Sequence, residues 1–150
     1  MQDLDLRALQ TELFLELTQL VSIQHRCAAV RLSAKGLDVT PAQARALMAL
    51  FQAREPLTQQ QLSLRLGCTE ASLVRVVRGL REGGWILRSP HPSDGRMYLL
   101  SPTEVARDRL PDFADVSNRL FDEVFADMDQ ASTQALLRQI QTLRHGLTRS

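Results

Sequence analysis

The chain has 150 residues, 44% of them hydrophobic, and a formal net charge of +1. This length and composition predict one well-packed domain, with room for an appended helical element. Its longest apolar runs are far shorter than the roughly 20 residues that span a bilayer. Asp3 and Asp5 stand where a signal peptide would be positive. We therefore expect a soluble cytoplasmic protein with no membrane partner.

Cysteine and histidine residues are few and far apart. Cys27 and Cys68 lack metal-ligand spacing with each other or with the three histidines, so we expect reduced thiols, no metal and no cofactor. The common hydrolase, zinc-protease and phosphate-loop motifs are absent, which makes an enzyme the least favoured class. Cys68 directly precedes a predicted helix whose N-terminus would favour a thiolate. For both cysteines, a redox-sensing role is the alternative to a packed thiol.

Positive charge is concentrated in the middle of the chain. Residues 57–101 carry six arginines and three acids, whereas residues 1–56 carry six bases and six acids, and residues 102–150 carry six bases and eight acids. This uneven distribution supports contact with nucleic acid without establishing it.

Helix signals begin near the N-terminus. Five leucines recur with the spacing of one helical face: Leu6, Leu9, Leu13, Leu17 and Leu20. They predict one long amphipathic helix over residues of about 4–33, ended by Lys35-Gly36. Residues 40–43, Thr-Pro-Ala-Gln, form a capping box with proline at the first helical position, which predicts a short helix through Phe51.

Two further helices with a short turn between them predict a helix-turn-helix. The first begins at the capping pattern of residues 58–61 and ends at Gly67, and the second is capped by Thr69 and covers about 70–82. Three apolar residues of the second helix are expected to face the core: Leu73, Val77 and Leu80. Gly79 costs this helix roughly 1 kcal/mol, which the close approach of another backbone or of DNA would justify.

A β-hairpin is predicted next, from apolar runs at residues 85–88 and 97–100. The loop between them contains Asp94-Gly95, a hairpin turn signal, and two prolines that argue against strand inside the loop. Residues 101–104 then predict a helix reaching about residue 128, which Pro111 kinks or delays. A last helix over about 130–147 has an apolar face of Leu136, Ile140, Leu143 and Leu147.

These elements predict a mainly α fold with a small β-hairpin wing. A winged helix-turn-helix over residues 37–101 is expected to be flanked by N- and C-terminal dimerisation helices, over residues 1–36 and 102–150. The apolar faces of the flanking helices exceed what one small central domain covers, which predicts a homodimer.

The central residues resemble one known family. Leu-Thr-Gln-Gln-Gln-Leu-Ser-Leu-Arg-Leu-Gly from residue 57, Ser-Leu-Val-Arg-Val-Val-Arg from residue 72, and Asp94-Gly95-Arg96 resemble the MarR family of bacterial transcriptional regulators. Ser-Leu-Val-Arg is most similar to the SlyA branch. The resemblance covers nearly the whole chain and is strongest over residues 57–101. It implies an obligate homodimer that binds a pseudo-palindromic promoter site and is released from that DNA by a small aromatic or phenolic effector. One departure is the lack of glycine at 101–106, just after the wing, which leaves the start of the next helix open.

Candidate contacts to double-stranded DNA follow from residue chemistry. Arg75 can form a two-pronged hydrogen bond with guanine in the major groove. Arg96 at the wing tip, oriented by Asp94, suits the narrow and negative minor groove. The full predicted set is Gln59, Gln60, Arg65, Thr69, Ser72, Arg75, Arg78, Arg88, Asp94 and Arg96. The alternative is that Arg75 and Arg78 are merely solvated and that Arg96 forms a surface ion pair.

Polar residues on the first helix are the candidate effector ligands. His25, Arg26 and Arg31 can meet a carboxylate or phenolate, although solvent-facing positions explain them equally well. The competing function is a winged-helix protein-interaction module without specific DNA binding. Such a module would not need a basic recognition helix together with an arginine-tipped wing.

Overall fold

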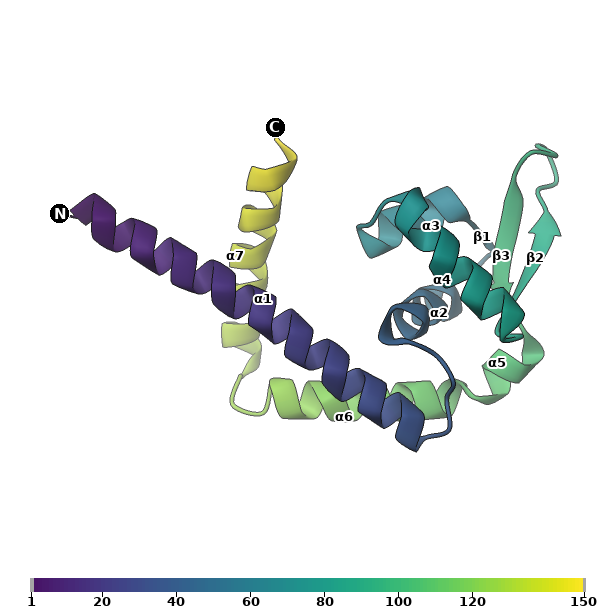
Figure 1. Ribbon diagram of the computed structural model, residues 1–150, viewed down its shortest axis with the longest axis horizontal. Coiled ribbons are helices and arrows are strands. Elements are labelled where there is room, and N and C mark those ends of the chain that lie inside the picture. The colour runs from purple at the N-terminus through teal and green to yellow at the C-terminus, as the bar shows by residue number, and fades with distance from the viewer. Residues whose placement is uncertain (1, 150) are drawn as a thin grey trace. The chain divides into compact units, whose positions relative to one another are not determined.

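The computed structural model describes residues 2–149, with side chains from residue 5 onward, and its chain divides into two compact units between Val116 and Ser117. The elements, labelled in Figure 1, are α1 (Gln2–Ala34), α2 (Pro41–Gln52), β1 (Leu57–Thr58), α3 (Gln59–Leu66), α4 (Glu70–Glu82), β2 (Ile86–Pro90), β3 (Tyr98–Pro102), α5 (Glu104–Asp108), α6 (Leu110–Val124) and α7 (Gln130–Thr148). The expected fold class, mainly α with a small β wing, is confirmed. Within residues 2–149, no helix has both the length and the apolar character that a membrane span requires.

Helix α1 confirms the first predicted helix but not its single apolar stripe. Leu6 and Leu13 of the predicted stripe are exposed, and so are Leu15 and Val30, which lie on other sides of the helix. Apolar residues on several sides of the helix therefore replace the single face that the leucine spacing indicates. The helix ends where Gly36 adopts a left-handed conformation with φ of 68°.

Local capping sets the starts of the next two helices as predicted. In α2, the Thr40 hydroxyl accepts from the Gln43 main-chain N–H at 3.2 Å, and the Gln43 side chain accepts from the Thr40 N–H at 2.8 Å. Thr58 and Gln61 repeat this reciprocal pair at the start of α3. These bonds satisfy N–H groups that a helix N-terminus otherwise leaves unpaired.

The core of the first unit lies between α2, α3, α4 and the sheet. Leu73, Val77 and Leu80 are buried as predicted, which fixes the face that α4 turns inward. The ring of Trp85, which precedes β2, contacts Phe113 of α6 edge-on at 5.6 Å. This packing fixes the orientation of α4 and therefore decides which of its side chains reach solvent.

A side chain, not the expected close approach of another backbone, explains Gly79 within the chain. A Cβ at residue 79 would collide with the side-chain amide of Gln43 on α2. The glycine therefore allows α2 and α4 to pack closely.

The sheet has the strand order β1-β3-β2 and is antiparallel throughout. The prediction that proline keeps strand out of the hairpin loop is wrong, because Pro90 ends β2 and pairs with Tyr98. Strand β2 lies at the sheet edge, where a missing N–H is tolerated. The short strand β1, paired with Leu99 and Leu100, was not predicted. In the first unit α4 contacts β2, and the β2–β3 hairpin extends past the short strand β1 as a wing (Figure 1).

The helix predicted after the wing is divided into two helices. Pro102 belongs to β3, where it pairs with Ile86, and Thr103 caps α5 by accepting from the Ala106 N–H at 3.1 Å. A break at Arg109 separates α5 from α6. Of the two predicted effects of Pro111, a kink or a delayed start, the structure shows a delayed start of the main helix. Helix α6 ends at Val124, four residues before the predicted end.

In the second unit, helix α7 confirms the last predicted helix. It begins where the Asp129 carboxylate accepts from the Ser132 N–H at 2.8 Å. Its apolar residues Leu136, Leu143 and Leu147 are all exposed in the single chain.

Candidate nucleic-acid interface

Helix α4 exposes the arginines that the sequence predicted. Arg75 and Arg78 are not buried, and they lie on the sides of the helix that Leu73 and Val77 leave free. At its N-terminus, the Thr69 hydroxyl accepts from the Ser72 N–H at 3.2 Å, and the Ser72 hydroxyl donates to the Thr69 carbonyl at 2.8 Å. The Thr69 hydroxyl thus caps the helix, the Ser72 hydroxyl bonds back to the cap residue, and both residues remain exposed.

Two hydrogen bonds accepted by Asp94 shape the tip of the wing. Its carboxylate accepts from the Arg96 main-chain N–H at 3.0 Å, and its carbonyl accepts from the Met97 N–H at the same distance. Among the described residues, the Arg96 guanidinium forms no ion pair with Asp94. Asp94 therefore orients Arg96 through the main chain and leaves its guanidinium exposed to solvent.

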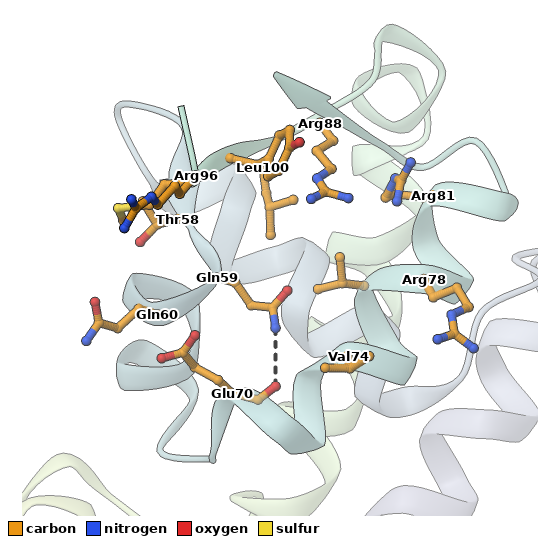
Figure 2. A pocket seen from close by; sticks show the side chains of 13 residues that line it. Thr58, Gln59, Gln60, Glu70, Val74, Arg78, Arg81, Arg88, Arg96 and Leu100 are labelled. Atoms are coloured by element: carbon orange, nitrogen blue, oxygen red, sulfur yellow. Dashed lines mark hydrogen bonds between the residues drawn. The ribbon is translucent and has the colours of Figure 1, made fainter. Parts of the chain in front are cut away.

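A cleft of about 580 Å³ lies between α3, α4 and the wing (Figure 2). It brings together five of the predicted contacts: Gln59, Gln60, Arg78, Arg88 and Arg96. The other five do not line it: Arg65, Thr69, Ser72, Arg75 and Asp94. The predicted set thus divides into residues of the cleft and residues on the surface around it.

The cleft has a strongly positive lining. Four arginines line it, against one carboxylate, that of Glu70. The Glu70 carbonyl accepts a hydrogen bond from Gln59 Nε2 at 3.3 Å, shown dashed in Figure 2. An excess of guanidinium groups in a concave surface attracts anions and raises their local concentration.

Among the cleft residues that the sequence-based set lacked, Arg81 and Tyr98 bear on anion binding. Arg81 lines it together with Arg78, one turn earlier on α4, and that spacing was a usable signal. Tyr98 has its ring beneath the Arg88 guanidinium, with Cζ 3.4 Å from the ring centroid. This second contact joins two strands, and only their register reveals it.

The candidate effector residues lie on α1. His25 and Arg26 lie before its last two turns, and Arg31 is half-buried in the last turn. A second cleft, of about 470 Å³, is lined by Arg78, Arg81, Arg88 and their neighbours. Neither this cleft nor the larger one includes the three candidates, so their binding role stays a prediction.

Cys68 is half-buried and packs against the core, as a packed thiol would. Cys27 is also half-buried. Among the described residues, no group of three histidine, cysteine or acidic side chains is placed to hold a metal ion.

The fold and this positive face define a winged helix-turn-helix protein. Residues 37–97 match the model of the MarR family. A curated relative, the HTH-type transcriptional repressor IacR of Pseudomonas putida, is 27% identical over 77 residues. That match covers 51% of this chain, and it spans about half of the relative, 46% of its length.

Solved structures with the same fold cover nearly the whole chain. A mutant MarR from E. coli, complexed with operator DNA, has a TM-score of 0.77 at 22% identity, over 88% of this chain and 93% of that one. CouR from Rhodococcus jostii RHA1, bound to p-coumaroyl-CoA, has a TM-score of 0.77 at 18% identity, over 90% and 93%. These likenesses show that the chain has the winged-helix fold of those proteins.

Proposed function

We propose that this chain is a homodimeric, sequence-specific DNA-binding regulator of transcription, acting as a repressor or as an anti-silencing activator. The observation that carries the proposal is the pairing of an exposed basic recognition helix with an arginine-tipped wing, on either side of an arginine-lined cleft. The solved MarR structure with operator DNA supports the same use of this fold. A regulator of this kind acts in the cytoplasm, where bacterial chromosomal DNA lies.

Helix α4 and the wing contact different grooves of the DNA in this proposal. Helix α4 enters the major groove, where Arg75 reads a guanine through its O6 and N7 atoms. The wing places Arg96 in the adjacent minor groove, whose narrow form concentrates negative potential. Exposed Gln60 and the neighbouring Arg65 contact phosphates and fix the register of the protein on the duplex.

A homodimer is part of the proposal because the flanking helices are apolar and exposed. Among their exposed side chains are Leu6, Leu9 and Leu13 of α1, and Leu136, Leu143 and Leu147 of α7. Exposed apolar area of this extent is typical of an interface. A two-fold dimer presents two recognition helices about one DNA turn, roughly 34 Å, apart, which suits a pseudo-palindromic site. Residues 1–36 and 102–150 are therefore proposed as the dimerisation region.

A small aromatic effector completes the proposal. The likeness of the fold to CouR bound to p-coumaroyl-CoA supports a ligand-responsive regulator. His25, Arg26 and Arg31 stay the candidate contacts for an acidic or phenolic group. The SlyA-like assignment rests on Ser-Leu-Val-Arg at the start of the recognition helix.

The test is a fluorescence anisotropy titration with the chain's own upstream DNA and with a random duplex, at about 50 and 200 mM salt. Tight binding to the upstream DNA that weakens steeply with salt is expected, because bound phosphates release counterions. Absence of binding at low salt would overturn the proposal and favour a protein-interaction module.

A thermal-shift screen of aromatic acids tests the effector. A compound that stabilises the protein and weakens DNA binding is expected, and its absence would point to a regulator controlled by its abundance.

A further inference from the structure

The stacking of Arg88 on Tyr98 has no part in the function proposed so far, although Arg88 itself is a predicted DNA contact. Arg88 lies opposite Leu100 and Tyr98 lies opposite Pro90, so the two side chains are diagonal neighbours on one face of the β2–β3 ladder. The guanidinium lies over the ring, with Cζ 3.4 Å from its centroid. Both residues line the cleft, and Figure 2 shows Arg88 directed from its strand into it.

Stacking leaves the hydrogen-bonding edge of the guanidinium unused. The π faces of an arginine meet the ring, while its N–H donors point outward in the guanidinium plane. Among the described residues, no carboxylate forms an ion pair with Arg78, Arg81 or Arg88. These charged donors are therefore available to an anion from outside the chain. The ring also restricts the rotamers of Arg88, which lowers the entropy lost when it binds.

The position of the cleft identifies the anion. Adjacent grooves of a DNA duplex are separated by one sugar-phosphate strand. When α4 occupies the major groove and the wing tip the minor groove, that strand must pass between α4 and the wing. Arg78 and Arg81 of α4 and Arg88 of β2 line both clefts in this region. Figure 2 places Arg81 and Arg88 at one end of the larger cleft and Arg96 at the other.

We propose that Arg78, Arg81 and Arg88 clamp the DNA phosphates between the two grooves, and that Tyr98 is the positioning residue that holds Arg88 ready for this contact. The inference rests on the proposed function and deepens it. It adds Arg81 to the interface and gives Tyr98 a role without direct contact to a base.

The experiment measures binding to a duplex selected from random DNA by the wild-type protein, over about 50 to 300 mM salt. Arg88→Ala and Arg81→Ala are each expected to lower the slope of log affinity against log salt concentration by about 0.9, the value for one phosphate contact. Arg107→Ala, which removes an exposed arginine of α5 outside both clefts, is the matched control and should leave the slope unchanged.

Tyr98 is tested by coupling. Tyr98→Leu is expected to weaken binding about two- to fivefold, the range of an exposed cation–π contact, whereas Tyr98→Phe retains the ring and should bind as the wild type does. In an Arg88→Ala background, Tyr98→Leu should have no further effect. Thermal unfolding of each variant provides the measure of folding, and the comparison with and without Arg88 tests the stack even if Tyr98→Leu lowers stability.

The outcomes separate the two proposals. Wild-type protein that fails to bind any duplex at low salt would overturn the proposed function itself. Normal wild-type binding with unchanged slopes for Arg81→Ala and Arg88→Ala would overturn the clamp alone. An equal loss from Tyr98→Leu with and without Arg88 would overturn the positioning role.

Discussion

The side-chain amide of Gln43 occupies the space that a Cβ on Gly79 would require. Gln43 is not free to move away without cost, because its Oε1 accepts the Thr40 N–H at 2.8 Å and completes the cap of α2. One glycine in the recognition helix therefore depends on one glutamine in the cap of an earlier helix. The contact links the start of α2 to the orientation of the helix that carries Arg75.

Gly79→Ala is expected to leave the stability unchanged or to lower it by up to about 1 kcal/mol, because the new Cβ displaces Gln43 and removes its capping bond, which costs about 0.5–2 kcal/mol, while the helix propensity of alanine offsets about 1 kcal/mol of that cost. In a Gln43→Ala background the collision is absent, and the same substitution should stabilise the protein by up to about 1 kcal/mol through helix propensity. Urea unfolding of the four proteins at one protein concentration measures this coupling. Equal effects of Gly79→Ala in both backgrounds would contradict the contact.

Arg75→Ala is expected to lose about 1–3 kcal/mol of binding free energy on the specific site, because a base contact is lost, with a smaller loss on random DNA. Anisotropy titrations on both duplexes at one salt concentration give the comparison. Arg107→Ala is the control for general charge removal. Equal losses on the two duplexes would reduce Arg75 to a phosphate contact.

Leu143→Glu tests the dimer. Leu143 is 48% exposed in the single chain, and in the proposed dimer it is buried. A buried, unpaired carboxylate is strongly unfavourable, so the variant should become a monomer or aggregate and lose site-specific binding. Light scattering measures the mass, with Thr142→Glu, also exposed, as the neighbouring control. A wild-type protein that is monomeric at micromolar concentration would refute the dimer and the palindromic-site mechanism.

The acid dependence of α7 follows from its cap. Hydrogen bonds donated by the main-chain N–H and the hydroxyl of Ser132 hold the pKa of Asp129 below its ordinary value near 3.8. Because the pKa is lower in the folded state, this group stabilises the fold fully above about pH 4, and the contribution is lost as the pH falls through the depressed pKa. An NMR titration of the Asp129 carboxyl carbon should show a midpoint below 3.8. The Ser132→Ala variant should move the midpoint upward. A wild-type midpoint at or above 3.8 would contradict the cap.

Features that depend on neighbours within one helical turn can be predicted from the amino-acid sequence alone. Interactions between residues three or four apart account for three such features. They are the capping boxes of Thr40 and Thr58, the buried face of α4 with Leu73 and Leu80, and the extent of α7. The exposed position of Arg75 follows in turn, because fixing the buried side of a helix also fixes its exposed side.

Features that join distant segments depend on how the folded chain packs. Pro90 lies in a strand because β2 is at the edge of the sheet, and edge position depends on which strands pair. The Arg88 and Tyr98 stack depends on the register of β2 against β3, and the contact of Gln43 with Gly79 depends on how α2 packs on α4. A single sequence fixes local hydrogen bonds and periodicity, whereas pairing register and helix packing emerge only when the whole core is assembled.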